Sequence, residues 1–335
     1  MAEPKFLVVR LGSLGDIVHA FPAVAALKES FPNGKIVWLT HPRWRELIAS
    51  AGLATEISEM DTRSFASVRA MRQKVHAEKF SAAIDYQGLW KSAALPFLSG
   101  VRRRIGFSSA SVREFGVQLL YTDRVRTRSA HVVEMNGELS ISAGAAKPTA
   151  DFSMTIPREA KATVRGMLTS NAVEDYVVLS PGGGWLSKCW PAETYGALAA
   201  RLRSELGVRC VINYGPGEKE LAEQVAAASG DATPVCFSGT VGELMELLQG
   251  AKCVVAGDTG PMHLADALGA RIVAIFGPTD PERNGPYVGR LRGKAIVLRA
   301  EGVESTYKRE NEAHPSLLRI SVEQVFEAVR KLEAQ

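Results

Sequence analysis

Apolar and polar positions follow two alternating patterns along most of the chain. Short runs of mostly apolar, often β-branched residues alternate with longer segments in which apolar residues recur every three or four positions, as in buried strands followed by amphipathic helices. In the first half, strands are predicted at residues 6–9, 35–39, 82–85 and 104–107. Helices are predicted there at residues 16–29, 43–51, 65–78, 89–98 and 131–142.

The same alternation begins again after a polar stretch at residues 145–172. The predicted strands are residues 176–180, 210–214, 235–237, 253–256 and 272–276, and the predicted helices include residues 192–206, 218–229 and 241–250. Strands that alternate with helices form parallel sheets with right-handed crossovers, so the sequence predicts an α/β protein with two doubly wound domains. We place these domains at residues 1–165 and 172–320. Residues 321–335, with Ser321 as the N-cap, should form a helix that packs back toward the N-terminal domain.

Composition agrees with two globular domains and narrows the functional classes. The chain has 335 residues, of which 46% are hydrophobic and 23% charged, which excludes disorder as the main state. The net charge of +4 permits an anionic partner without requiring nucleic acid. We see neither a signal peptide nor an apolar stretch of the ~20 residues that a membrane span needs. Four dispersed cysteines fit no zinc or disulfide pattern, which favours reduced thiols and no metal.

A glycine-containing loop connects the first predicted strand to the first predicted helix. Residues 10–16 read Arg-Leu-Gly-Ser-Leu-Gly-Asp, which lacks both the G-x-G-x-x-G dinucleotide fingerprint and the Walker A pattern. Asp16 stands where the helix begins. It either caps that helix or serves as a carboxylate that accepts a proton from a substrate hydroxyl, and spacing alone leaves both interpretations open.

A second candidate site follows the strand at residues 176–180. Gly182, Gly183 and Gly184 allow backbone N–H groups to approach a ligand, and Lys188 adds a point charge suited to phosphate. The alternative is a flexible loop with a solvated lysine. In either case the loop lies at the carboxyl end of a predicted parallel strand, where open α/β sheets bind ligands.

A third candidate site combines a strand end with a helix start. Asp258, Thr259 and Gly260 precede Pro261, a residue that the first helical turn tolerates, and His263 lies within one turn. Backbone N–H groups at that helix start would attract a phosphate. The alternative is that Asp258 and Thr259 are caps and that His263 is a core side chain. We expect the ligand loops of the two domains to face each other across a cleft.

Other charged positions have more than one interpretation. Glu218 follows another strand and could bind a ribose hydroxyl or favour the following helix dipole. Basic residues of the first domain either form solvated faces or bind an anionic acceptor. These basic residues are Arg63, Arg69, Arg72, Lys74, Arg102, Arg103, Arg104 and Arg113.

Four ordered motifs between residue 6 and about residue 330 resemble glycosyltransferase family 9, the family of bacterial lipopolysaccharide heptosyltransferases. The motifs are Arg-Leu-Gly-Ser-Leu-Gly-Asp-Ile-Val-His at 10–19, Lys-Cys-Trp-Pro at 188–191, Asp-Thr-Gly-Pro-Met-His-Leu-Ala at 258–265 and Phe-Gly-Pro-Thr-Asp-Pro at 276–281. Gln-Gly-Leu-Trp-Lys-Ser-Ala at 87–93 and Ser-Val-Arg-Glu at 111–114 are most similar to the heptosyltransferase I branch. The resemblance implies a GT-B fold with an N-terminal acceptor domain and a C-terminal donor domain.

The resemblance also implies the reaction and its residues. The donor would be ADP-L-glycero-D-manno-heptose, the acceptor a Kdo residue of the lipopolysaccharide inner core carried on lipid A, and the transfer inverting and free of metal or other cofactor. Asp16 matches the general base and Lys188 the lysine that neutralises the leaving diphosphate. The implied donor-binding residues are Gly183, Gly184, Lys188, Glu218, Thr240, Val241, Asp258, Thr259, Gly260 and His263. The implied acceptor-binding residues are Ser13, Gly15, Arg63, Gln87, Lys91 and Arg113.

The implied enzyme is a cytoplasmic monomer that contacts the inner leaflet of the inner membrane through basic residues of its first domain. Three alternatives stay open at this point. The chain could be a family 9 transferase that uses another nucleotide sugar or acceptor. It could also be a non-catalytic nucleotide- or glycan-binding protein of the same fold, although the presence of Asp16 and Lys188 argues for retained chemistry. A nicotinamide oxidoreductase is disfavoured because its fingerprint is missing.

Overall fold

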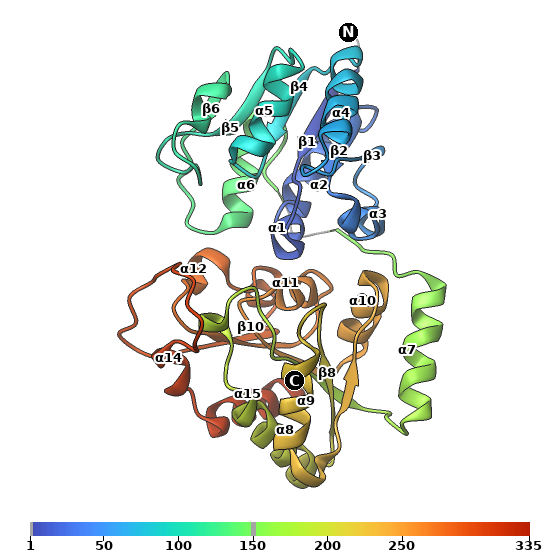
Figure 1. Cartoon of the computed structure of the whole chain (residues 1–335), viewed down its shortest axis with the longest axis vertical. Coiled ribbons are helices and arrows are strands. Elements are labelled where there is room, and N and C mark those ends of the chain that lie inside the picture. The colour runs from blue at the N-terminus through green and yellow to red at the C-terminus, as the bar shows by residue number, and fades with distance from the viewer. Residues whose placement is uncertain (1–2, 149–151) are drawn as a thin grey trace. The chain divides into compact units, whose positions relative to one another are not determined.

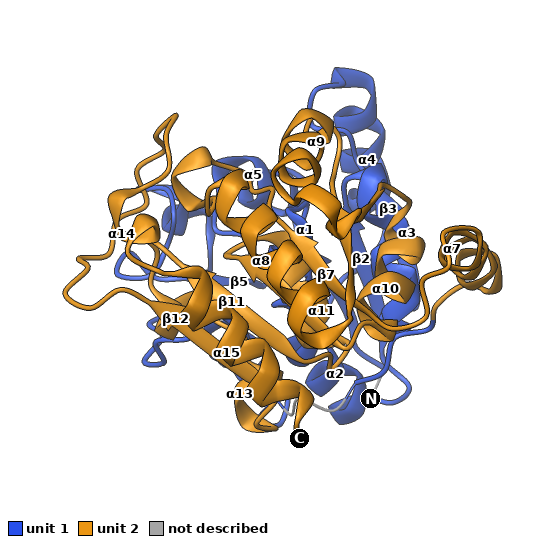
Figure 2. Ribbon diagram, turned by 90° about the horizontal axis from the view of Figure 1, so that it is seen from below, with its two compact units in different colours: residues 1–155 blue, residues 156–335 orange. Residues whose placement is uncertain are grey.

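The computed structural model describes residues 3–148 and 152–335 and divides the chain into two compact units, residues 1–155 and 156–335 (Figure 2). The division falls earlier than the expected boundary at residue 165. The polar stretch that precedes residue 172 contains an unpredicted helix, α7 (Arg158–Ser170), which packs against α10 (Val241–Gly250) in the second unit. Its amphipathic face buries Ala160 and Val164. This segment is therefore part of the second unit and not a linker.

In the described part of unit 1, six strands form one parallel sheet in the order β3-β2-β1-β4-β5-β6 (Figure 1). Its strands are β1 (Lys5–Val9), β2 (Lys35–Thr40), β3 (Glu56–Glu59), β4 (Ala82–Asp85), β5 (Arg104–Phe107) and β6 (Asp123–Val125). Its helices are α1 (Leu14–Val18), α2 (Phe21–Ser30), α3 (Arg45–Ala51), α4 (Phe65–Ala77), α5 (Trp90–Leu98) and α6 (Val132–Ser142), and the short η1 (Pro42–Trp44) and η2 (Val117–Leu120) are 3₁₀ turns. Apolar β1 and β4 residues are fully buried at its centre.

Two details of unit 1 differ from the sequence prediction. The helix expected at 16–29 is interrupted after Val18, and α2 begins at Phe21 with Pro22 in its first turn. Proline lacks an N–H group and its ring opposes the preceding turn, so it fits a helix start better than a helix interior. Strands β3 and β6 were not predicted because they are short, polar and form the two edges of the sheet.

Within the described residues of unit 2, six further strands form a parallel sheet in the order β12-β11-β10-β7-β8-β9. Its strands are β7 (Tyr176–Ser180), β8 (Arg209–Asn213), β9 (Val235–Phe237), β10 (Cys253–Gly257), β11 (Ile272–Phe276) and β12 (Ala295–Arg299). Besides α7 and α10, its helices are α8 (Ala192–Leu206), α9 (Lys219–Ala228), α11 (Gly260–Ala267), α12 (Pro281–Asn284), α13 (Val288–Leu291), α14 (Pro315–Leu318) and α15 (Val322–Glu333); the 3₁₀ turns are η3 (Leu186–Lys188) and η4 (Gly230–Ala232).

The C-terminal helix α15 corrects another expectation. Its apolar residues Val325, Phe326 and Val329 are buried in the core of unit 2, together with residues of α8, β10 and β11. The Trp190 indole donates a hydrogen bond of 3.0 Å to the Ile320 carbonyl just before this helix. The apolar face of this helix therefore packs on the sheet of its own unit, whereas we expected the helix to pack back toward the N-terminal domain.

Both sheets reverse their strand order at one point. In unit 1 the chain runs from β1 outward to β3 and then returns to β4 on the other side of β1. In unit 2 the same reversal lies between β7 and β10. Ligands of open α/β sheets bind beyond the carboxyl ends of the strands at such switch points. Asp16 follows β1 and Asp258 follows β10, so each unit carries a candidate carboxylate at its own switch point.

Gly106 of β5 tests the packing that supports the unit 1 site. A Cβ at this position would overlap the Tyr121 ring, whose hydroxyl donates a 2.7 Å hydrogen bond to the buried Asp85. We expect Gly106→Ala to lower the free energy of unfolding by about 1–3 kcal/mol, as overpacked cores do. The control Gly166→Ala lies in α7, where no atom beyond the neighbouring backbone of its own helix comes within 4 Å of the new Cβ, so it should be neutral or stabilising by about 0.4–1 kcal/mol. Equal urea stability of the two variants would contradict this packing.

Candidate active site

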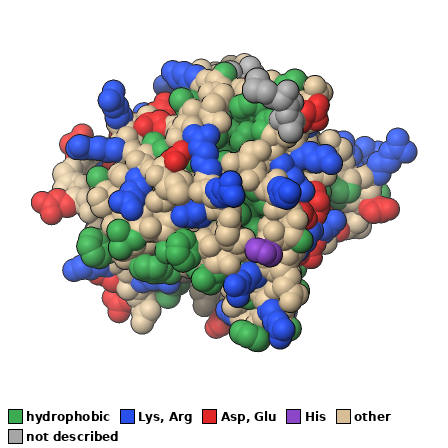
Figure 3. Space-filling model, turned by 90° about the horizontal axis from the view of Figure 1, so that it is seen from above, with side chains coloured by type: hydrophobic (Ala, Val, Ile, Leu, Met, Phe, Trp, Pro, Cys, Tyr) green, Lys and Arg blue, Asp and Glu red, His purple; other side chains and the backbone are tan. Residues whose placement is uncertain are grey.

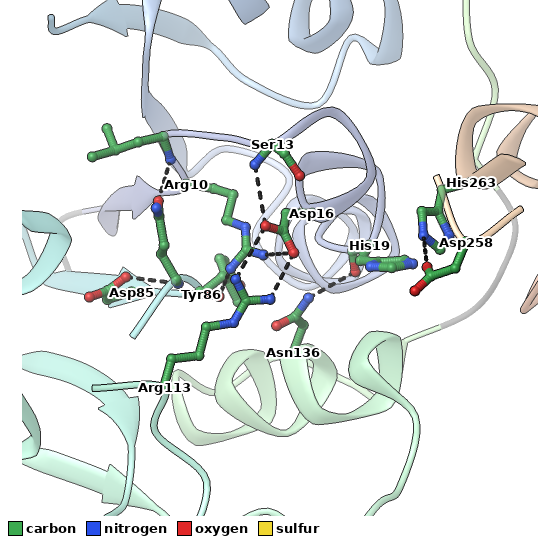
Figure 4. A network of polar contacts seen from close by, with 12 residues as sticks. Arg10, Ser13, Asp16, His19, Asp85, Tyr86, Arg113, Asn136, Asp258 and His263 are labelled. Carbon is green, nitrogen blue, oxygen red and sulfur yellow. Dashed lines mark hydrogen bonds and ion pairs between the residues drawn. The ribbon is translucent and has the colours of Figure 1, made fainter. Parts of the chain in front are cut away.

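The Asp16 carboxylate of α1 lies between two arginine side chains (Figure 4). Its Oδ1 is 2.6 Å from Arg10 Nη2 and 2.8 Å from Arg113 Nη2. Its Oδ2 lies 3.3 Å from Arg113 Nη1 and accepts a hydrogen bond of 3.3 Å from the Ser13 backbone N–H. Arg10 is buried, whereas 42% of the Arg113 side chain and 20% of the Asp16 side chain are exposed. The Asp16 carboxylate therefore pairs with the buried Arg10 on its interior side and with the exposed Arg113 on its solvent side.

Local sequence explains why this cluster forms. Strand β1 ends at Val9, and Arg10 continues it into the interior, where its guanidinium donates to the Tyr86 carbonyl after β4. Gly12 has a φ of +154°, and a Cβ there would come within 2.8 Å of the Trp44 indole nitrogen. The loop can thus turn back toward Arg10, and α1 begins close enough for Asp16 to pair with it.

The charge of Asp16 is set by these two arginines. Burial alone raises the pKa of a carboxyl, but the positive charges of Arg10 and Arg113 outweigh it, so the pKa of Asp16 falls well below its usual range. Asp16 is consequently an ionised proton acceptor with reduced basicity. The same pairing raises the pKa of Arg113 against the opposing effect of burial, so both partners stay charged.

A buried carboxylate at the end of β4, Asp85, holds the loop that adjoins this cluster. Asp85 Oδ1 accepts the backbone N–H groups of Gln87 and Gly88 at 2.9 and 3.3 Å, and its Oδ2 accepts the Ser92 and Tyr121 hydroxyls at 2.8 and 2.7 Å. Burial raises the pKa of Asp85, although these donors act against the rise. Four donors satisfy the buried carboxyl and fix the backbone that accepts from Arg10.

The second cluster lies in unit 2 and is built on Asp258 at the end of β10. Asp258 Oδ2 is 2.6 Å from Lys188 Nζ, and Asp258 Oδ1 is 3.3 Å from His263 Nε2. Burial raises the pKa of Asp258, but the hydrogen bond from His263 and the charge of Lys188 outweigh it and lower the pKa well below its ordinary value. Lys188 Nζ also lies 4.3 Å from the centre of the Trp185 ring. Lys188 is thus held on two sides by its own unit.

A cavity of about 120 Å³ opens beside this cluster. It lies at the carboxyl ends of β7, β8 and β10, across the switch point of the unit 2 sheet. Its lining residues are Ser180, Gly182, Gly183, Gly184, Asn213, Glu218, Thr259, Gly260 and Pro261. The buried Thr259 hydroxyl oxygen has no hydrogen-bond partner within the part of the chain that the structure describes. Because Thr259 is the N-cap of α11, this hydroxyl and the helix N-terminus form a site suited to an anion.

Glu218 forms one wall of this cavity. Its Oε2 accepts the Gly215 backbone N–H at 2.8 Å, and a Cβ at position 182 would overlap its carboxylate. Only glycine therefore fits at position 182, because the Glu218 carboxylate occupies the space that a Cβ atom would take. The carboxylate keeps acceptor capacity for a hydroxyl donor such as those of a ribose.

The structure brings together most of the predicted donor residues but not all of them. Gly183, Gly184, Glu218, Thr259 and Gly260 line the cavity, and Lys188, Asp258 and His263 form the adjoining ion-pair cluster. Thr240 and Val241 do not line it. The Thr240 hydroxyl accepts the Glu243 N–H at 3.2 Å and so caps α10, which Val241 begins.

The predicted acceptor residues fall into different environments in unit 1. Ser13 and Arg113 contact Asp16, and Gly15 is buried within α1. Gln87 is also buried, and its amide oxygen accepts the Leu11 N–H at 2.8 Å. Arg63 and Lys91 are exposed, on the loop before α4 and on α5.

Sequence reasoning missed the roles of Arg10, Trp185 and Asn213. Arg10 was noted only as part of a motif, although a cation that directly continues an apolar strand is a signal of a buried ion pair. Trp185 contacts two cations, since the Arg309 guanidinium also lies 5.0 Å from its ring centre. Asn213 lies at the end of β8, where the sheet topology places ligand residues.

Among residues 3–148 and 152–335, no three His, Cys, Asp or Glu side chains are grouped so that they could hold a metal ion. Over the same ranges, no helix combines the length and the apolar character that crossing a bilayer requires.

Comparisons with known proteins relate this chain to one family. The model of glycosyltransferase family 9 (heptosyltransferase) matches residues 68–314. Lipopolysaccharide heptosyltransferase 1 of Escherichia coli K12 is 28% identical over 300 residues, covering 84% of this chain and 91% of that protein. The structure of E. coli heptosyltransferase WaaC with ADP superposes with a TM-score of 0.77 at 27% identity, covering 98% of this chain and 99% of that one. E. coli ADP-heptose heptosyltransferase II shares the fold, with a TM-score of 0.82 at 21% identity and 99% coverage of both chains.

Proposed function

The chain belongs to glycosyltransferase family 9, the lipopolysaccharide heptosyltransferases, and from this premise we propose that it transfers L-glycero-D-manno-heptose from ADP-heptose to Kdo of the lipopolysaccharide inner core. Its two parallel sheets match the GT-B structures of that family, and its resemblance is to the heptosyltransferase 1 branch at moderate identity. The observation that carries the proposal is the anion site of unit 2, where Lys188, Thr259 and the start of α11 adjoin one cavity.

Unit 2 supplies the chemistry expected of a donor site. A nucleotide sugar carries two phosphate groups and a ribose, which call for cations, N–H donors and a hydroxyl acceptor. Lys188 and the N-terminus of α11 fit the diphosphate, and Glu218 fits a ribose hydroxyl. The 27% identical WaaC structure was solved with ADP, which favours an adenine nucleotide.

We propose that Asp16 receives the proton of the acceptor hydroxyl and that Lys188 stabilises the leaving diphosphate. As the acceptor hydroxyl oxygen bonds to the anomeric carbon, its proton passes to Asp16, and the bond between that carbon and the diphosphate oxygen breaks. ADP then departs with the electron pair. Attack from the face opposite the diphosphate inverts the anomeric centre. Lys188 and the dipole of α11 are positioned before reaction to stabilise the charge that develops on the diphosphate, so the proposed reaction requires no metal.

The contacts of Asp16 indicate which oxygen would act. A carboxylate has about four lone-pair sites, and on Oδ1 the arginines occupy both at 2.6 and 2.8 Å. On Oδ2 both contacts measure 3.3 Å and are weak. We propose that the acceptor hydroxyl replaces one of these weak contacts. Oδ2 would then receive the proton while Arg10 holds Oδ1.

The acceptor site is proposed on unit 1. Kdo carries a carboxylate and lipid A carries phosphates, so exposed cations near Asp16 fit this acceptor. Arg113 is the nearest, while Arg63 and Lys91 are exposed elsewhere on the unit. We further propose that the enzyme acts as a monomer at the cytoplasmic face of the inner membrane, where its acceptor is anchored.

Incubation with ADP-heptose and Kdo-lipid A, followed by mass spectrometry, tests this function. We expect addition of one heptose, release of ADP, and product formation that persists in a chelating buffer. Parallel reactions with UDP- and GDP-sugars should give at most traces. Transfer from another nucleotide sugar alone would replace the donor assignment, and ADP binding without turnover on any acceptor would favour a binding protein of the same fold.

A further inference from the structure

Unit 1 exposes a group of large apolar side chains that the reaction does not use. Phe115 is 88% exposed, Leu119 64%, Leu98 55%, Trp90 46% and Phe97 44%. We call these five residues the apolar patch. Single exposed apolar residues are normal, but large contiguous ones mark interaction surfaces.

The members of the apolar patch come from two segments that contact each other. Trp90, Phe97 and Leu98 belong to α5, whereas Phe115 lies two residues before η2 and Leu119 lies within it. The Trp90 ring lies 3.1 Å from the Cβ position of Gly116, and the backbone N–H of Trp90 donates to Glu114 Oε2 at 2.7 Å. At the other end of α5, Arg104 lies 5.3 Å from the Phe97 ring centre and donates to the Leu120 carbonyl at 2.7 Å. The two segments thus form one surface.

Positive charge borders this surface. Arg72 donates a 3.0 Å hydrogen bond to the Leu98 carbonyl, Arg104 packs against Phe97, and Lys91 and Arg102 are exposed on or just after α5. Seen from above, Figure 3 likewise shows hydrophobic side chains gathered on one part of the molecular surface, with Lys and Arg side chains around them. Apolar and aromatic side chains surrounded by cations fit the interfacial region of an anionic bilayer, because the former enter the acyl boundary while the latter meet lipid headgroups.

Residues 113–115 connect the apolar patch to the proposed base along the chain. Arg113, which pairs with Asp16, is separated from Phe115 by Glu114 alone, and Glu114 in turn accepts from Trp90. A lipid-linked acceptor must present its sugar to Asp16 while its acyl chains stay in the membrane. A membrane-docking surface that begins two residues from Arg113 meets this requirement.

We infer that the apolar patch inserts into the headgroup region of an anionic lipid bilayer and so brings Asp16 to membrane-anchored acceptors. The function of this surface rests on the proposed transfer to a lipid-linked acceptor, whereas its binding to lipid does not. If basic residues alone bound the membrane, high salt would abolish the binding, and insertion of apolar side chains changes this expectation. Salt should weaken binding through screening of the arginines but leave a residual part that the apolar patch supplies.

Flotation of the full chain with vesicles of 70% phosphatidylcholine and 30% phosphatidylglycerol tests the inference. The double variant F115S/L119S should bind these vesicles at least about tenfold more weakly than the wild type and should lose the salt-resistant part. The control L291S removes a side chain of similar exposure, 68%, from unit 2 and should bind as the wild type does. Unchanged binding of the double variant, or equal losses in both variants, would overturn the inference.

Activity on two acceptors separates this inference from the proposed function. The double variant should transfer heptose to a fully deacylated, water-soluble acceptor at the wild-type rate, but at least about tenfold more slowly to Kdo-lipid A in the same vesicles. If the wild type fails on both acceptors, the proposed function is wrong and the flotation result still decides lipid binding. If sedimentation instead shows a wild-type dimer that the double variant dissociates, and neither protein floats, the surface joins two copies and the inference is wrong.

Discussion

Asp16→Asn is expected to slow heptose transfer by about 10²–10⁴-fold while ADP binds with nearly unchanged affinity. The asparagine amide has the size of the carboxyl group but cannot take up the proton of the acceptor hydroxyl. ADP binding should survive because the cavity and its ion-pair cluster belong entirely to unit 2. Turnover in a transfer assay and calorimetry with ADP measure the two quantities.

Folding must be monitored in this variant, since it leaves the buried Arg10 without its anionic partner. Thermal unfolding reports that loss. Asp123→Asn is the matched control, because Asp123 also pairs with an arginine of unit 1, Arg103 Nε at 2.8 Å, but lies away from the β1 switch point. The control should turn over at the wild-type rate. A folded Asp16→Asn protein with wild-type turnover would refute the base assignment.

Lys188→Met is expected to slow transfer by about 10²–10³-fold and to weaken ADP binding as well. Methionine retains the apolar stem beside Trp185 but removes the charge that stabilises the departing diphosphate. It also removes the cation that balances the Asp258 carboxylate, so the negative charge of Asp258 beside the anion site is no longer compensated by a lysine. This variant should therefore impair both steps, whereas Asp16→Asn impairs only one.

Lys252→Met provides the control for the lysine. Lys252 also belongs to unit 2 and pairs with an aspartate, since its Nζ lies 2.7 Å from Asp175 Oδ2, but this pair is on the surface. Loss of an exposed pair changes stability by at most about 1 kcal/mol, so ADP affinity and turnover should stay at wild-type values. If both lysine variants had equal ADP affinity, Lys188 would not contact the diphosphate.

Much of the fold could be predicted because the local spacing of apolar residues distinguishes strands from helices. The apolar runs at 176–180 and 272–276 are fully buried strands, and the helix at 192–206 ends where Gly207 adopts a left-handed conformation. The family match over residues 68–314 confirms the resemblance that the ordered motifs indicated. Neither α7 nor the position of α15 could be inferred, because which core a helix covers depends on contacts distant in sequence.

The candidate site was predictable in composition but not in its electrostatics. The motifs placed Asp16 and Lys188 in the segments that follow β1 and β7, on the side of each sheet where parallel sheets bind ligands. That Asp16 pairs with Arg113, almost one hundred positions away, follows only from β1 and the segment after β5 lying near one another in the folded unit. For Thr240 the resemblance implied a donor contact, whereas the structure shows its hydroxyl as the cap of α10.

A crystal structure with a non-transferable ADP-heptose analogue and a Kdo acceptor analogue tests the central claim most directly. We predict that Asp16 Oδ2 lies about 2.6–3.2 Å from the attacking hydroxyl, with the diphosphate contacting Lys188 and the first turn of α11. The acceptor oxygen should face the anomeric carbon opposite the diphosphate. A bound complex in which the Asp16 carboxylate has no contact with the acceptor, or in which the diphosphate lies outside the unit 2 cavity, would contradict the account.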